Sequence, residues 1–319
     1  MNATTVYTDT ITTREDYHLV ALLSSVFGIF AITICTTILI LIYRTKPRLH
    51  TTHHLLISNT CFASIFYSII TIINYIFFLF VQWETSTIGC QLRAYFSYVG
   101  IASVLHSYMI QAISRIFFCV LSTKYRWLTK FKTHYYLIGI QWFVVLLITS
   151  STLITKDIQY HPEKLCFIPL QNTLHVVCAI FAYYIIPLLI TICIYLYIFY
   201  KMKRLEEVIM NTKTTQNRAK RDLEFLRNIV FLISIYIAGG LPSIVYFLTP
   251  TKYPYLINLV TQSIAVALAT LCTILLDRDI RQVIKNILRR TTRVVPFVHT
   301  LTMGKVQQNR QTIKQINIH

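Results

Sequence analysis

The sequence predicts an all-α membrane protein, in which a seven-transmembrane helix bundle is followed by a short amphipathic helix on the inner leaflet. Three observations support this fold class: the apolar composition, the length of the uncharged intervals, and the placement of Lys and Arg. Of the 319 residues, 55% are hydrophobic and only 13% are charged, whereas about 25% are charged in typical soluble domains. The composition therefore favours a chain whose solvent is lipid.

Seven intervals contain no Asp, Glu, Lys or Arg, and each is long enough for a helix that spans the hydrocarbon core, which needs about 20 residues. Backbone polar groups in hydrocarbon must be hydrogen-bonded within the segment, so we expect helices although β-branched residues are common. The intervals lack the alternating polarity of barrel strands. Within a bundle over 17–276, the predicted helices are residues 17–43, 53–81, 90–123, 133–155, 172–202, 219–249 and 255–276.

The basic residues predict on which side of the membrane each loop lies. With the N-terminus outside, the three inner loops hold three, four and eight Lys and Arg and the C-terminal segment holds nine, so 24 of the 30 lie inside. The positive-inside rule selects this orientation. We therefore expect a multi-pass protein of the plasma membrane with an extracellular segment 1–16, a glycosylation sequon at Asn2 and a cytoplasmic tail 291–319.

The segment 278–290 predicts an amphipathic helix directly after the bundle. Its apolar residues recur at helical spacing, and basic residues occupy most of the remaining positions. The apolar set is Ile280, Val283, Ile284, Ile287 and Leu288. Such a helix binds the interface of an anionic leaflet through its apolar face and its charge. We expect it to lie on the inner leaflet, with the lipid bilayer as its partner.

Several other functions find no support in the sequence. The net charge of +18 is explained by membrane topology, so no nucleic-acid partner is expected. We find no nucleophile–base pair and no phosphate-binding loop, and predict no catalytic residue, no enzyme activity and no cofactor. His50, His53 and His54 lack a Cys or carboxylate partner at ligand spacing, so no metal site is expected. A seven-span transporter stays as an alternative, although most predicted spans lack the ionisable residues of a transport path.

Two of the eight cysteines lie on the oxidising side of the membrane. Cys90 is at the outer start of the third predicted helix and Cys166 lies in the longest outer loop, whereas the other six fall inside spans. Disulfides form in this compartment, which makes these two the natural pair, with two free thiols as the alternative. Arg115 lies 25 residues after Cys90 within the apolar stretch QAISRIFFCVL, and a charge there indicates a functional site.

These residues resemble the motifs of the rhodopsin-like (class A) G-protein-coupled receptors. In that family a cysteine that opens the third helix is bridged to the second outer loop, and an arginine follows it by 25 residues. Further residues at matching positions are Trp142, Pro187, Tyr195 and Pro242. The resemblance covers about residues 17–290. It implies a Cys90–Cys166 disulfide, an extracellular ligand, and contact of Arg115 with a heterotrimeric G protein when the sixth helix moves outward.

The motif around the arginine departs from the family pattern. The family's Asp-Arg-Tyr reads Ser114-Arg115-Ile116, so the arginine lacks its adjacent acidic partner. Counting twenty residues back from the sixth-helix proline reaches Asp222, where many members carry an acidic residue. The resemblance therefore predicts an Arg115–Asp222 pair across the inner ends of the third and sixth helices. Glu224 is a competing partner, and a solvated Asp222 is the alternative.

The sixth and seventh helices also depart from the family. Cys-Trp-x-Pro reads Gly239-Gly240-Leu241-Pro242, which removes the bulky toggle side chain and places two glycines before a proline. Glycine loosens a helix and proline kinks it, so we expect switching by backbone hinging at 239–242. The seventh helix lacks the Asn-Pro-x-x-Tyr motif. These losses leave a receptor-like protein that no longer couples to a G protein as a further alternative.

The resemblance also implies which residues line a ligand pocket. Ser97 stands where aminergic receptors carry an aspartate, and a cationic amine would lack its counter-ion, which argues against monoamines. A short peptide is the expected ligand. The implied pocket residues are Asn74, Tyr75, Ser97, Tyr98, Ile101, Ser243, Phe247, Tyr255, Leu259 and Ser263.

Overall fold

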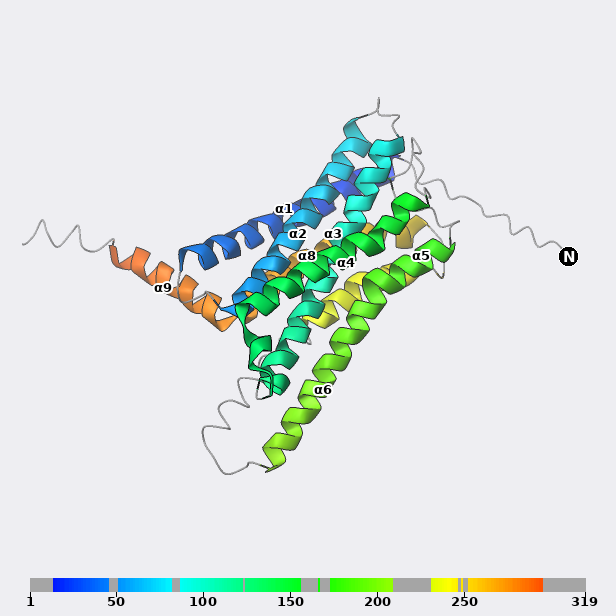
Figure 1. Ribbon diagram of the computed structural model, residues 1–319. Coiled ribbons are helices and arrows are strands. Elements are labelled where there is room, and N and C mark those ends of the chain that lie inside the picture. The colour runs from blue at the N-terminus through cyan, green and yellow to red at the C-terminus, as the bar shows by residue number, and fades with distance from the viewer. Residues whose placement is uncertain are drawn as a thin grey trace, which may run out of the picture. The chain divides into compact units, whose positions relative to one another are not determined.

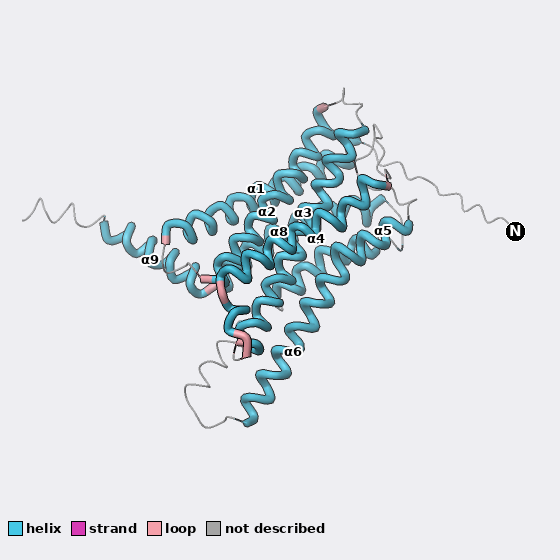
Figure 2. Tube along the Cα trace, viewed as in Figure 1, coloured by secondary structure: helices cyan, strands magenta, loops and turns pink. Residues whose placement is uncertain are grey.

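The computed structural model describes residues 14–45, 51–81, 87–122, 124–155, 166, 173–208, 231–245, 248 and 252–294. The chain divides into two compact units, Met1–Thr273 and Ile274–His319. The described residues are helical apart from short turns, and no strand occurs among them (Figure 2).

The helices of the first unit follow one another with short connections where these are described. They are α1 (Arg14–Arg44), α2 (Thr52–Phe80), α3 (Thr87–Ile116), the π-helix η1 (Phe117–Leu121), the 3-10 turn η2 (Arg126–Thr129) and α4 (Phe131–Ile154). Then come α5 (Thr173–Ile180), the π-helix η3 (Phe181–Ile185), α6 (Ile186–Val208), an unlabelled helix over Phe231–Val245, and α8 (Lys252–Leu276). Among the described residues, six helical stretches are long and apolar enough to cross a membrane, and Phe231–Val245 is a shorter apolar helix. The all-helical, multi-span fold class is therefore confirmed.

Many large apolar side chains are exposed on the outside of these helices, and small or hydroxyl-bearing side chains are frequent among the buried ones, beside larger apolar residues such as Ile38 and Leu56. On α1, Leu22 and Phe30 are exposed whereas Ser24 is buried. This distribution suits a surface in contact with lipid tails. Many buried hydroxyls donate to a carbonyl one turn earlier on the same helix, as when Ser103 Oγ donates to Gly100 O over 2.8 Å. Such bonds satisfy many of the hydroxyls inside the bundle, as hydrocarbon requires.

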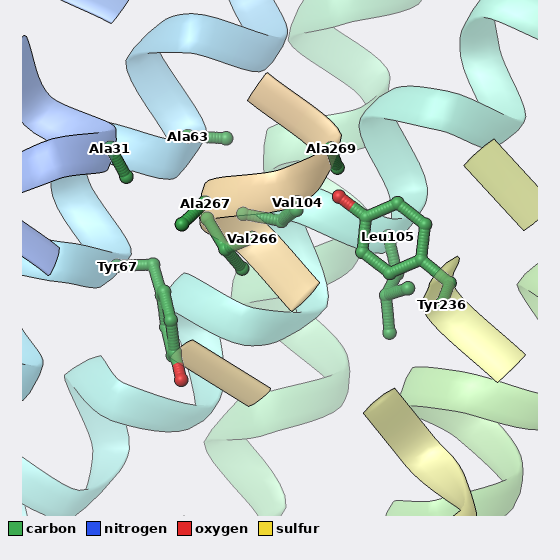
Figure 3. Packing of buried hydrophobic residues seen from close by; sticks show 9 residues of the cluster. All are labelled: Ala31, Ala63, Tyr67, Val104, Leu105, Tyr236, Val266, Ala267 and Ala269. Carbon is green, nitrogen blue, oxygen red and sulfur yellow. The ribbon is translucent and has the colours of Figure 1, made fainter. Parts of the chain in front are cut away.

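α3 is the central helix of the first unit, in contact with α2, α4 and α6 (Figure 1). Gly100 allows its close approach to α2, because a Cβ at this position would lie 3.0 Å from Tyr67 Cα. Small residues at such contacts let membrane helices pack tightly. The largest buried cluster joins α1, α2, α3, α8 and the Phe231–Val245 helix (Figure 3), and its members are Ala31, Ala63, Tyr67, Val104, Leu105, Tyr236, Val266, Ala267 and Ala269.

A polar network joins α2, α3 and α4 inside the bundle. Asn59 Nδ2 donates to Gln141 Oε1 over 2.7 Å, and Trp142 Nε1 donates to Asn59 Oδ1 over 3.0 Å. Gln141 Nε2 in turn donates to Ser103 O over 3.1 Å. Asn59 and Gln141 are buried, so each satisfies the polar atoms of the other in surroundings without water. The network fixes how α2 and α4 pack around α3.

The second unit contains α9 (Arg278–Val294). Asp277 caps this helix, because its Oδ1 accepts hydrogen bonds from the backbone N–H groups of Asp279 and Ile280, both at 2.9 Å. An aspartate at this position satisfies donors that the first turn leaves unpaired and suits the positive end of the helix dipole. α9 covers the interval of the predicted amphipathic helix, and its place on the inner leaflet stays a prediction.

Candidate functional site

A cavity of about 220 Å³ lies between the helices of the first unit. Its walls come from α2, α3, α5, η3, the Phe231–Val245 helix and α8. Of the residues implied by the family resemblance, the cavity is lined by Asn74, Tyr75, Ser97, Tyr98, Ile101, Ser243 and Leu259. Ser263 is buried and bonded to its own helix, at 3.5 Å from Leu259 O, but does not line the cavity. Phe247 and the side chain of Tyr255 lie outside the described part of the chain.

Sequence reasoning missed much of the cavity wall. The additional polar or aromatic residues are Tyr67, Thr71, Tyr183, Tyr184, Tyr236, Asn258 and Gln262. With Tyr75 and Tyr98, six tyrosines line the cavity, and no Asp, Glu, Lys or Arg is among the described residues that do so. A charged group that entered would lose its hydration without gaining a counter-ion there, which is unfavourable. The wall therefore suits an uncharged group with an apolar body and hydrogen-bonding atoms.

Two hydrogen-bonded polar pairs lie in different parts of the cavity wall. In one pair, Asn74 Nδ2 donates to Ser97 Oγ over 2.7 Å, and Ser97 Oγ donates to Arg93 O over 3.0 Å. In the other pair, Ser243 Oγ donates to Asn258 Oδ1 over 2.6 Å. Each pair links two elements, α2 with α3 and the Phe231–Val245 helix with α8. A ligand that bonds to either pair would touch groups that already hold neighbouring helices together.

A disulfide joins Cys90, in the first turn of α3, to Cys166. The Cα atoms are 5.4 Å apart and 76 residues separate the two cysteines. Both sulfurs are buried together with Ala94. Arg93 lies beside the bridge, with Nη2 3.8 Å from Cys166 Sγ and its guanidinium 4.4 Å from the ring centroid of Phe77. The alternative of two free thiols is therefore wrong.

Arg115 lies at the end of α3, where its Nη2 is 3.1 Å from His53 Nδ1 of α2. Arginine only donates hydrogen bonds, so the histidine nitrogen accepts and carries no proton in this arrangement. Sequence reasoning had only excluded a metal site at His50, His53 and His54 and did not foresee this contact. Asp222 and Glu224 lie outside the described residues, so the Arg115–Asp222 pair stays a prediction, as does glycosylation at Asn2.

Tyr195 lies near the same end of the bundle. Its side chain is buried on α6 in a cluster with Ala112 of α3 and Ile198, and Ile233 of the Phe231–Val245 helix packs against them. One residue before the arginine, Ser114 Oγ is 2.8 Å from His134 Nε2 of α4. Helices on three sides thus contact the last turns of α3.

The architecture and these positions can be compared with known families. The sequence profile of the 7 transmembrane receptor (rhodopsin family) matches residues 34–276, well over half of the chain. The chain belongs to this family. Its class A resemblance is thereby confirmed, and it is a multi-pass membrane protein of the G-protein-coupled receptor type. No individual characterised protein matches the chain.

The Phe231–Val245 helix is the sixth span of this rhodopsin-family receptor and is distinct from α6, which belongs to the fifth span. Its proline segment borders the cavity. Gly239 and Gly240 are buried and line it, and Pro242 follows half-buried. Proline has no N–H, so the carbonyl of Ala238 loses the donor that the helix would supply four residues later. Thr261 Oγ1 of α8 donates to Gly239 O over 3.4 Å. The family's tryptophan position is thus occupied by a glycine that faces the cavity.

Proposed function

We propose that this receptor lies in the plasma membrane with its N-terminus outside, binds an extracellular ligand in the cavity, and activates a heterotrimeric G protein through outward movement of the sixth helix. The cavity supports this proposal best, because it is bordered by both the sixth-helix hinge and the core of the bundle. A ligand shifts such a bundle only by binding its open state more tightly than its closed state.

The proposed ligand presents an uncharged group to the cavity. The six tyrosines and three amides of the wall offer aromatic contacts and hydrogen bonds, and the described lining carries no charge. A volume of about 220 Å³ is below the usual range of about 300–1,000 Å³ for drug-sized ligands. The cavity therefore suits a small neutral molecule, or the uncharged end of a short peptide whose remainder stays outside it.

The proposed switch at the inner end is the release of Arg115. In the structure His53 accepts a hydrogen bond from it over 3.1 Å, and the sequence predicts a further restraint by Asp222. The basic tail 291–319 and the amphipathic segment 278–290 are proposed to lie at the cytoplasmic face and on the inner leaflet, where anionic lipids attract them.

Nucleotide exchange on purified G proteins tests the coupling. The wild type and the variants Arg115→Ala and Asp222→Ala are compared without ligand in membranes, at equal surface amounts. We expect Asp222→Ala to raise basal exchange and Arg115→Ala to lower it or leave it low. Arg126→Ala is the matched control, because Arg126 is exposed in η2, and it should behave as the wild type. Equal rates in all four proteins would reject the restraint and favour a receptor-like protein that does not couple.

The ligand class has a separate test. Short peptides with capped, uncharged ends are compared with the same peptides carrying free termini, and the readout is the rise in unfolding temperature of the purified receptor. Binding to the folded state stabilises it by mass action, so capped peptides should raise the temperature more. A larger rise with the charged forms would contradict the cavity as the ligand site.

A further inference from the structure

Tyr184 is the residue that connects the cavity with the sixth-helix hinge. It lies in η3, between α5 and α6, and its side chain lines the cavity. Its hydroxyl donates to Tyr236 O over 2.5 Å and lies 3.4 Å from Ile237 O. Both carbonyls belong to the turn of the Phe231–Val245 helix that directly precedes Gly239 and Gly240. The hydroxyl thus holds the backbone on the inner side of the hinge.

The ring of Tyr184 occupies space that Gly240 leaves open. A Cβ built on Gly240 would overlap the Cζ, Oη and Cε2 atoms of Tyr184. Nothing larger than a hydrogen atom fits at this position while the tyrosine keeps its place, which explains why a glycine stands there. Gly239 is equally confined, because its Cβ would overlap that of Ala265 on α8. The two glycines therefore make room for side chains of two different helices, Tyr184 of η3 beside Gly240 and Ala265 of α8 beside Gly239.

The π-helix η3 places Tyr184 at this point. Pro187 has no N–H to give to the carbonyl four residues earlier, so the α-helical hydrogen-bond ladder is interrupted in this segment. The N–H of Ile186 bonds instead to Phe181 O, five residues back. The wider turn changes the direction in which residues 183 and 184 point. Tyr183 packs among Val99, Ala102 and Val145 of α3 and α4, whereas Tyr184 reaches the Phe231–Val245 helix.

We propose that Tyr184 is the positioning residue that transmits occupancy of the cavity to the 239–242 hinge, in place of a bulky side chain at position 240. This inference rests on the proposed ligand site in the cavity. With its ring in place, Tyr184 holds the backbone at Tyr236 and Ile237 and the hinge stays closed. A ligand that moves the ring breaks these bonds and frees two adjacent glycines before a proline, which is a backbone that bends easily.

Hydrogen–deuterium exchange of the full-length receptor in detergent micelles tests this role without any ligand. Tyr184→Phe keeps the ring and removes the hydroxyl, and the segment 232–245 should exchange about fivefold faster, the factor expected for one lost hydrogen bond. Tyr95→Phe is the matched control. It likewise removes a hydroxyl that donates to a backbone carbonyl, Leu146 O of α4 over 3.4 Å, at a residue that is not among the described cavity-lining ones, and it should leave this segment within about twofold of the wild type. A purely packing role would leave the segment unchanged, because the ring is retained.

A second pair of variants tests the steric part. Gly240→Ala should displace the ring of Tyr184 and raise both exchange in 232–245 and basal G-protein nucleotide exchange. In a Tyr184→Ala background, Gly240→Ala should cause no further rise. Gly139→Ala is the control, since a Cβ there meets nothing within 4 Å, and it should change neither readout.

The two readouts separate the inference from the proposed function. Faster deuterium exchange in Tyr184→Phe without any G-protein signal would support the hinge and reject the coupling. A G-protein signal that all Tyr184 and Gly240 variants share with the wild type, with unchanged deuterium exchange, would overturn the role of Tyr184 and leave the coupling standing. If Gly240→Ala fails to fold, the Tyr184→Phe and Tyr95→Phe comparison still decides the result.

Discussion

Replacement of Asn59 by alanine should destabilise the bundle by breaking the polar network of α2, α3 and α4. The change deletes the bonds at 2.7 Å to Gln141 and at 3.0 Å from Trp142. Side-chain hydrogen bonds between membrane helices contribute about 0.6 kcal/mol on average and up to about 1.7. Two such bonds give about 1.2 kcal/mol, and burial of partner atoms left unpaired adds about 1–3 kcal/mol. We expect a total loss of about 2–4 kcal/mol.

A double-mutant cycle measures how much of this loss belongs to the bond between Asn59 and Trp142. The receptor is purified in detergent, and unfolding is followed for Asn59→Ala, Trp142→Phe and the double variant. Trp142→Phe keeps an aromatic ring beside Phe62 and Phe66, whose centroids lie 5.7 and 6.2 Å away, and removes the indole N–H. The expected coupling free energy is about 0.6 kcal/mol.

The control is Ser58→Ala on the same helix. The hydroxyl of Ser58 donates to His54 O of its own helix, at 2.8 Å, so its loss should have little effect on packing between helices. The reasoning fails if Asn59→Ala destabilises the receptor no more than Ser58→Ala does. It also fails if the losses of Asn59→Ala and Trp142→Phe are additive, because additive losses indicate independent sites.

Three further outcomes follow from contacts described above. Gly100→Ala should lower the unfolding temperature in detergent, because the new Cβ would lie 3.0 Å from the α2 backbone. Gly139→Ala, whose Cβ would meet nothing within 4 Å, should leave the unfolding temperature unchanged. A larger drop in Gly139→Ala than in Gly100→Ala would contradict the close helix contact. Cys90→Ser should lower the free energy of unfolding by up to about 4 kcal/mol, because the bridge spans 76 residues. Dithiothreitol should destabilise the wild type by the same amount. An unchanged unfolding temperature in both cases would refute this. His53→Ala should raise basal nucleotide exchange, because it removes the acceptor 3.1 Å from Arg115. His53→Gln supplies another acceptor and should give a lower rate than His53→Ala; identical rates of the two variants would count against the contact.

The spans and the outer cysteine pair could be predicted from the sequence because both depend on gross properties. Long uncharged intervals are enough to place helices in hydrocarbon, and only Cys90 and Cys166 stood on the oxidising side. Part of the cavity lining could also have been predicted from the sequence. Tyr67 and Thr71 precede Asn74 by seven and three residues on α2, so helical periodicity would have extended the predicted face to them.

The contacts between helices could not be predicted in the same way. Asn59 and Gln141 are conspicuous polar residues within apolar spans, but nothing in the sequence says that they bond to each other. The contact of Arg115 with His53 joins residues 62 positions apart. Tyr184 was missed because residues 176–200 of the predicted helix 172–202 are almost entirely apolar, so they show no periodicity that would assign the helix faces. Pro187 was the available signal, since a missing N–H often leads to an irregular turn before it.

The π turn at Phe181–Ile185 has a consequence for how this receptor tolerates changes in length. A turn closed between residues i and i+5 contains one residue more than an α-helical turn, so α5 and α6 hold one residue beyond what a regular helix needs at this point. Deleting a single residue here can therefore convert the segment to a regular α-helix, so that α5 and α6 keep the same sides toward the bundle while Tyr184 turns away from the cavity. In an alignment of related receptors, a one-residue gap in this segment would mark members whose hinge is controlled by another side chain.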